Sequence, residues 1–163
     1  MKELNREQRL LRRYLDRYKN IMRKKKALEQ TLQEIRDDFM VSAFHAFSDS
    51  GGHAPLVHSP VPAYIEQCES ICGQIKTLVK VAADELIEIQ KVIDLLPEGS
   101  DEWLVLTYKY IMRKNAYEIA DEIPCGYVTV YRILDRAIDQ LLELENVTYI
   151  LNRFSRTLKD EIE

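Results

Sequence analysis

The fold of this chain is decided by the stretch NAYEIADEIPCGYVTVYRILDRAIDQLL, residues 115–142. Its apolar spacing predicts two helices joined by a tight turn, because Val130 and Ile133 lie three residues apart on one helical face. Ala120 is small enough to let the second helix cross closely, and Cys125 is expected to fill the turn. Two helices that meet steeply through a short turn describe a helix-turn-helix, whose second helix can enter a DNA major groove.

The segment from Trp103 to Leu142 also resembles a known family. The resemblance is carried by the runs W-L-V-L-x-Y-x-Y, Y-E-I-A-x-x-I and T-V-Y-R-x-x-x-R-A-I-x-x-L. These runs are similar to region four of bacterial sigma factors. With its long helical N-terminal part, the whole chain resembles phage and prophage transcriptional regulators of the RinA/ArpU type. The resemblance implies a C-terminal helix-turn-helix that binds promoter DNA.

The outward face of the second helix in this motif is the candidate DNA-reading surface. Its side chains are Tyr127, Val128, Thr129, Tyr131, Arg132 and Arg136. Arg can pair with guanine through two hydrogen bonds, Thr can bond a base edge or phosphate, and Val can touch a thymine methyl group. Arg113, Lys114 and the amide end of the helix starting at Asn115 are placed for phosphate contacts. The resemblance implies the same role for the recognition-helix positions.

The charge of the chain is not concentrated at this motif. The net charge is −4, and residues 97–163 hold eight Lys or Arg against thirteen Asp or Glu. Because phosphate neutralisation supplies most non-specific affinity, this balance argues against strong DNA binding by one head alone. Asp135 and Asp139 on the second helix would also repel phosphate. A helix-turn-helix used only for protein contacts is therefore the alternative.

Residues 3 to about 40 are expected to form one long helix. Two series of apolar residues recur every seven positions, as in the a and d positions of a coiled coil: Leu4, Leu11, Tyr18, Leu32 and Phe39, with Tyr14, Ile21, Leu28 and Ile35. Lys25 interrupts the first series, and a polar residue there commonly sets register or partner number. The adjacent basic run, residues 23–26, is interpreted as a solvated face, with a phosphate or acidic partner as the alternative.

A second long helix is expected over residues 63–96, after a flexible connector at 46–62. Gly51, Gly52 and three prolines exclude regular helix from that connector. The apolar residues of the second helix again form two series: Ile65, Cys72, Val79, Leu86 and Ile93, and Cys68, Ile75, Ala82, Ile89 and Leu96. A stripe this broad needs more than one helical neighbour. Antiparallel pairing with the first helix covers part of it, and the remainder predicts a second copy of the chain.

The C-terminal part is expected to begin with a capped helix. Ser100 or Asp101 caps this helix, which is apolar from Trp103 to Ile111. The recognition helix is expected to end near Glu145, and Asn146 separates it from a last amphipathic helix that packs on the coiled coil. The sequence thus predicts an all-α protein in three parts. These are a long antiparallel helical hairpin (1–99), a sigma-region-four-like helix-turn-helix (100–145) and a C-terminal helix (146–163).

Catalysis and metal binding are disfavoured by the motifs. The chain has no Gly-rich phosphate loop, no H-E-x-x-H and no nucleophile elbow, so we predict no catalytic residue and no cofactor. His53, His58, Cys68 and Cys72 match no common zinc spacing, which predicts no metal site, and His45 is expected at the surface. Three Cys without an apolar leader or a spanning segment predict a cytoplasmic protein with free thiols and no membrane contact.

The favoured hypothesis is a regulator of the phage or prophage type that reads double-stranded promoter DNA. Its N-terminal helices would form an oligomer, with a dimer favoured, or hold the protein against RNA polymerase. A dimer would raise DNA affinity through effective concentration. One alternative is a DNA-recognition subunit for phage genome packaging, resembling a small terminase subunit. The other is an interaction factor that does not bind DNA.

Overall fold

The computed structural model describes residues 5–49 and 61–160, which form seven α-helices and one π-helical turn, with no β-strand. The prediction of an all-α protein is confirmed for these residues. The chain divides into two compact units. Unit 1 joins the chain up to Asn20 to the chain from Ala83 onward, and unit 2 is Ile21–Ala82. The units divide the chain differently from the three predicted parts, because the first helix belongs with the C-terminal helices.

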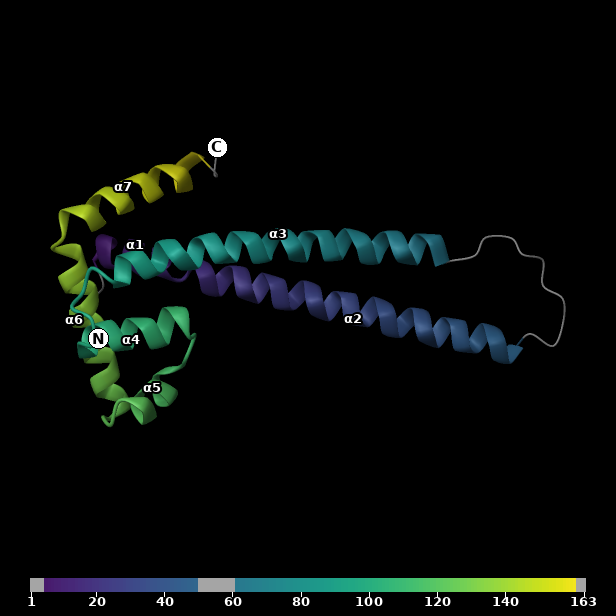
Figure 1. Ribbon diagram of the computed structural model, residues 1–163, viewed down its shortest axis with the longest axis horizontal. Coiled ribbons are helices and arrows are strands. Elements are labelled where there is room, and N and C mark those ends of the chain that lie inside the picture. The colour runs from purple at the N-terminus through teal and green to yellow at the C-terminus, as the bar shows by residue number, and fades with distance from the viewer. Residues whose placement is uncertain (1–4, 50–60, 161–163) are drawn as a thin grey trace. The chain divides into compact units, whose positions relative to one another are not determined.

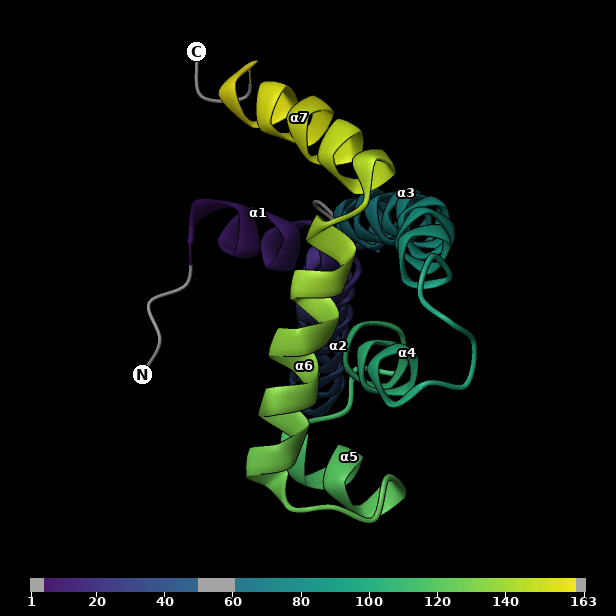
Figure 2. The same cartoon turned by 90° about the vertical axis from the view of Figure 1, so that its left-hand side faces the viewer.

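Unit 1 is built around α6, residues Tyr127–Leu142 (Figure 2). Four helices contact α6: α1 (Arg6–Leu15), α4 (Asp101–Leu106), α5 (Ala116–Glu122) and α7 (Glu145–Asp160). The buried side chains of α6 are Val130, Ile133, Leu134, Ala137, Ile138 and Leu141. Fully burying one Leu or Ile side chain contributes about 1.5–3 kcal/mol, so this face provides much of the cohesion of the unit.

The helix before the motif begins where the sequence predicts. Ser100 is its N-cap, and the Ser100 hydroxyl accepts a hydrogen bond from the Trp103 N–H at 3.2 Å. After Leu106 the helix widens into the π-helical turn η1, Thr107–Ile111. The apolar stretch from Trp103 to Ile111 is therefore helical throughout, and it buries Val105, Leu106 and Tyr110.

The prediction of one uninterrupted helix from residue 3 to about 40 is wrong. The helix breaks at Asp16, and α2 then runs over Arg17–Asp49 (Figure 1). The physical reason is the packing of α1, because Leu11, Tyr14 and Leu15 are buried in the core of unit 1. The apolar spacing of seven continues through the break and therefore does not reveal it.

The predicted limits of the connector, 46–62, are also wrong. Helix α2 continues to Asp49, and α3 runs over Val61–Ile93, ending before the predicted residue 96. Pro62 is compatible with the first turn of α3, because the first N–H groups of a helix have no partner within it. Residues 50–60, with His53 and His58, lie outside the described residues. His45 is exposed, as predicted.

The C-terminal helix begins earlier than predicted. Helix α6 ends at Leu142 rather than near Glu145, and Asn146 lies in the first turn of α7 rather than before it. Helix α7 packs on α1 and α6, burying Val147 and Leu151. The rings of Phe154 and Tyr14 meet edge to face with centroids 5.4 Å apart. The tail is therefore part of the core of unit 1.

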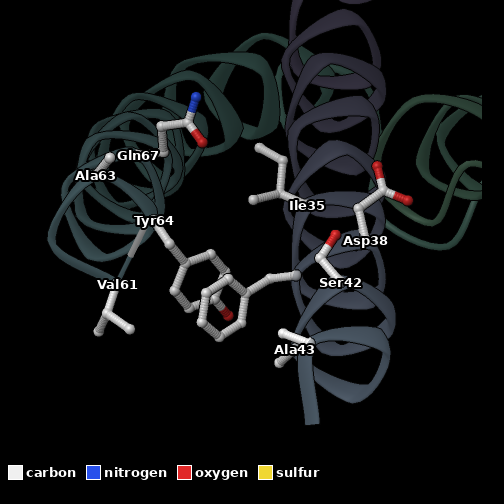
Figure 3. Close-up of a pocket in the computed structure, with 10 residues that line it drawn as sticks. Ile35, Asp38, Ser42, Ala43, Val61, Ala63, Tyr64 and Gln67 are labelled. Atoms are coloured by element: carbon white, nitrogen blue, oxygen red, sulfur yellow. The ribbon is translucent and has the colours of Figure 1, made fainter. Parts of the chain in front are cut away.

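Unit 2 has a small core. Here α2 and α3 lie side by side and run in opposite directions (Figure 1). Among the described residues of this unit only Leu32 and Ala82 are buried, with 8% and 4% of their surface exposed. The Phe39 and Tyr64 rings stack with centroids 4.0 Å apart, beside a largely apolar cavity of about 560 Å³ (Figure 3).

We expect Tyr110→Phe to change how the free energy of unfolding depends on pH. Tyr110 is 1% exposed, and burial raises the pKa of its phenol above the ordinary value of 10.0. The folded state therefore holds this proton more tightly than the unfolded state, so stability falls as pH rises above about 10. Relative to the variant, the natural protein should lose up to about 1.4 kcal/mol per pH unit there.

Urea unfolding of both proteins between about pH 8 and 11 measures this difference. Below about pH 9 the difference between the two free energies of unfolding should be constant, because the phenol is neutral in the folded and unfolded states. A difference that also stays constant above about pH 10 would contradict the prediction.

Candidate nucleic-acid interface

Helix α5 is fixed at its start by a reciprocal cap. The Asn115 side chain accepts hydrogen bonds from the N–H groups of Tyr117 and Glu118 at 3.0 and 3.1 Å. The Glu118 carboxylate accepts one from the Asn115 N–H at 2.7 Å. This capping box explains why the helix begins where the sequence predicts.

The turn between α5 and α6 consists of residues 123–126. Ile123 leaves the helix in an extended conformation, with φ −106° and ψ 105°. The Cys125 N–H donates to the Ala120 carbonyl at 3.5 Å, which holds the turn against α5. Gly126 is the N-cap of α6, and no side chain caps that helix. The Thr129 N–H donates to the Gly126 carbonyl at 2.8 Å, whereas the N–H groups of Tyr127 and Val128 have no such partner. The start of α6 carries the positive end of the helix dipole.

The two faces of α6 differ sharply in exposure. Val130 and Ile133 are 2% and 5% exposed and lie in the core. The six side chains predicted to point outward are all exposed: Tyr127, Val128, Thr129, Tyr131, Arg132 and Arg136. The structure therefore brings these six residues together on one accessible surface, which we call the outer face of α6.

The acidic residues beside this face are bound by α1. The Arg12 guanidinium forms an ion pair with Asp135 at 2.6 Å, and the Gln8 amide donates to Asp139 at 2.5 Å. These are the two carboxylates that the sequence predicts to repel phosphate. The positive charge of Arg12 offsets the negative charge of Asp135. The repulsion between α6 and a phosphate is therefore smaller than the sequence of α6 alone indicates.

The two arginines of the outer face have different surroundings. Arg136 forms an ion pair with Glu102 of α4. No ion pair or side-chain hydrogen bond of the described residues involves Arg132. Arg132 is therefore available to an external partner, whereas Arg136 must first leave a carboxylate.

The residues before α5 have contacts within the chain. Arg113 adopts a left-handed conformation with φ 58°, which is unusual for a residue other than Gly and stores about 1–3 kcal/mol of strain. Lys114 forms an ion pair with Glu122, and this hydrogen bond raises the pKa of Lys114. Asn115 is occupied by its cap. Arg113 is exposed and has no ion pair among the described residues, and its guanidinium lies 5.8 Å from the centre of the Tyr18 ring.

Sequence reasoning missed several residues that shape this surface. Tyr117 is 67% exposed, and its ring lies 5.2 Å from that of Tyr127. Its position on the face of α5 opposite the apolar residues was the available signal. Gln8, Arg12 and Glu102 were missed because no local pattern links them to α6, from which they are 34 to 131 residues distant.

Two features are absent from the part of the chain that the structure describes, a metal-binding cluster and a membrane-spanning helix. No cluster of His, Cys, Asp and Glu there is arranged to hold a metal ion. The thiols of Cys68, Cys72 and Cys125 are free and half-buried. Within residues 5–49 and 61–160, no helix combines the length and apolar character that a bilayer crossing requires.

Comparison with known proteins adds no relative. No protein-family model matches the sequence, and no curated protein or solved structure is significantly similar to it. The resemblance to sigma factor region four therefore stays a prediction from the motifs.

We expect Asn115→Ala to lower the free energy of unfolding by about 1 kcal/mol, because two backbone N–H groups lose their cap. Asn115→Asp is the matched control, since aspartate caps helices as well as asparagine does. Urea unfolding monitored by circular dichroism measures both variants. Equal stability of Asn115→Ala and the natural protein would contradict the structural role of this cap.

Proposed function

We propose that this chain is a sequence-specific DNA-binding transcriptional regulator of the phage or prophage type. In this proposal α5 and α6 act as a helix-turn-helix, and α6 lies in the major groove of promoter DNA. The observation that carries the proposal is the outer face of α6, where an unpaired Arg132 accompanies exposed Thr129 and Val128. These three side-chain types can read a guanine, a base edge or phosphate, and a thymine methyl group.

The electrostatics of α6 support an anionic partner. Its first turn has no side-chain cap, so the N–H groups of Tyr127 and Val128 can approach a phosphate. Its two carboxylates are bound by Arg12 and Gln8. Recognition helices use mainly their N-terminal residues to contact bases, and residues 127–132 are the part of α6 with the most exposed side chains.

The long helices supply the second part of the proposal. We infer that α2 and α3 form an antiparallel coiled-coil hairpin through which two copies associate. The small core of unit 2 favours this, because α3 has more apolar surface than α2 covers. A dimer would strengthen DNA binding by effective concentration, which offsets the weakly basic head. Contact with RNA polymerase is the other role open to the hairpin. A regulator of this kind acts in the cytoplasm without a cofactor.

One observation favours a second function. Three tyrosines of this region expose about half of their surface or more: Tyr117 (67%), Tyr127 (48%) and Tyr131 (50%). Exposed aromatic side chains are common at protein interfaces. An interaction factor would bind a protein through this surface and would show no salt-dependent DNA binding, whereas phosphate contacts make DNA affinity fall steeply with salt.

We expect Arg132→Ala to weaken binding to a DNA fragment selected by the purified protein from a random pool. The loss should be about 1–3 kcal/mol if Arg132 reads a base. Arg156→Ala on α7 is the matched control, because it removes the same charge from another exposed position. Fluorescence anisotropy measures the affinities. Equal losses in the two variants would assign the effect to net charge and contradict base reading.

We expect Glu102→Gln to strengthen DNA binding severalfold, because it frees Arg136 from its ion pair. Arg136→Ala should weaken binding, and the double variant should bind like Arg136→Ala alone. This pattern separates release of Arg136 from a general loss of negative charge. An increase in affinity that persists when Arg136 is absent would contradict the role of Arg136.

A further inference from the structure

Helix α3 carries an apolar stripe that does not face α2. Its residues Ile65, Cys72 and Val79 follow one another at intervals of seven, and we call them the outer stripe. Ile65 and Val79 are 47% and 48% exposed, and Cys72 between them is half-buried. The residues that lie toward α2 are partly or fully buried: Tyr64, Cys68, Ile71, Ile75, Leu78 and Ala82. The outer stripe is therefore a second apolar surface beside the one that α2 covers.

Charged residues flank the outer stripe, with the acidic residues before Cys72 and the basic residues after it. Glu66 and Glu69 precede Cys72, and Lys76 and Lys80 follow it. All four are exposed, and within residues 61–93 and the other described ranges no ion pair involves any of them. Helical geometry places the four on the same side of the stripe, the side away from α2.

We propose that the outer stripe is the contact between two copies of this chain, with the two α3 helices antiparallel about a twofold axis at Cys72. In this register Ile65 meets Val79 of the second copy, and the two Cys72 side chains meet each other. The axis is perpendicular to both helices, so the charged sides of the two stripes lie along the same edge of the contact.

The charge order selects this arrangement. The twofold axis at Cys72 places each residue opposite the one whose number adds with its own to 144. Glu69 therefore lies within one residue of Lys76 of the second copy. Glu66 lies within two residues of Lys80. A parallel pairing about a twofold axis would instead place the charged sides of the two stripes on opposite edges of the contact, so these Glu and Lys residues would have no partner of opposite charge there. Opposite charges across helices set partner orientation, so the antiparallel contact is favoured.

The centre of the contact allows a close approach. Cys72 is small, and nothing lies within 4 Å of a Cβ placed at the neighbouring Gly73. From Ile65 to Val79 the outer stripe extends about 21 Å at 1.5 Å per residue. A second copy thus provides the further helical neighbour that the apolar width of α3 requires.

This inference rests on the self-association in the proposed function and specifies its surface. Dimerisation is measured without DNA, so its failure is distinguishable from failure of DNA recognition. A dimer that does not bind DNA would support the interface and contradict DNA recognition, whereas a monomer that binds DNA would contradict the interface.

Disulfide formation tests the position of the twofold axis. Cys68→Ser with Cys125→Ser leaves Cys72 as the single thiol, and Cys72→Ser with Cys125→Ser leaves Cys68 one turn away. Both remaining thiols are half-buried in the natural chain. We expect mild oxidation to give a reducible covalent dimer of the Cys72 protein and little or none of the Cys68 protein. Cross-linking of Cys68 in preference to Cys72, or of neither thiol, would overturn the proposal.

Charge reversal tests the pairing independently of the thiols. Glu69→Lys and Lys76→Glu should each weaken the dimer about tenfold, measured by analytical ultracentrifugation, because each places like charges together at two symmetric sites. The double reversal should restore the natural affinity. Circular dichroism verifies that all variants remain helical. A double variant as weak as the single ones, or a natural protein that is monomeric at about 100 µM, would overturn the proposal.

Discussion

The apolar face of α6 is the constraint on which the rest of unit 1 depends. Ala137, Ile138 and Leu141 are completely buried, and α1, α4, α5 and α7 all pack on this helix. Because protein interiors are close-packed, a helix surrounded on one side in this way cannot rotate about its axis. The polar residues on its opposite side are therefore fixed in direction. The surface proposed to meet DNA is in this sense a consequence of the core.

The ion pairs around α6 matter more for the local electric field than for stability. The Asp135 side chain is 58% exposed, and an ion pair at such a site contributes about 0–1 kcal/mol to folding. The ion pair matters more for an approaching anion, because an unpaired carboxylate beside Arg132 would repel that anion. Because Arg12 is paired with Asp135, the positive charge of Arg132 is not opposed by a free Asp135 carboxylate beside it. Glu102 acts in the opposite direction by holding Arg136.

The sequence predicts the elements whose causes are local. The helix start at Asn115, the exposure of Tyr127 and the burial of Ile133 all follow from residues within one or two turns. The break at Asp16 could not be predicted, because Leu11 and Tyr18 keep the same spacing of seven across it. The neighbours of α6 on α1 could not be predicted either, because Arg12 and Asp135 are brought together only by the tertiary fold. Exposure of the outer face followed from periodicity, whereas the pairing of its charges did not.

The division of unit 1 between the two ends of the sequence has a consequence during protein synthesis. Arg12 and Asp135 are 123 residues apart, so at 5–20 residues per second α1 leaves the ribosome about 6–25 s before α6 does. During that interval Leu11 and Leu15 have none of their α6 neighbours, while α2 and α3 can already pair. Chain order therefore allows the long helices to pair first, whereas α1 can be buried only after its C-terminal neighbours have been translated.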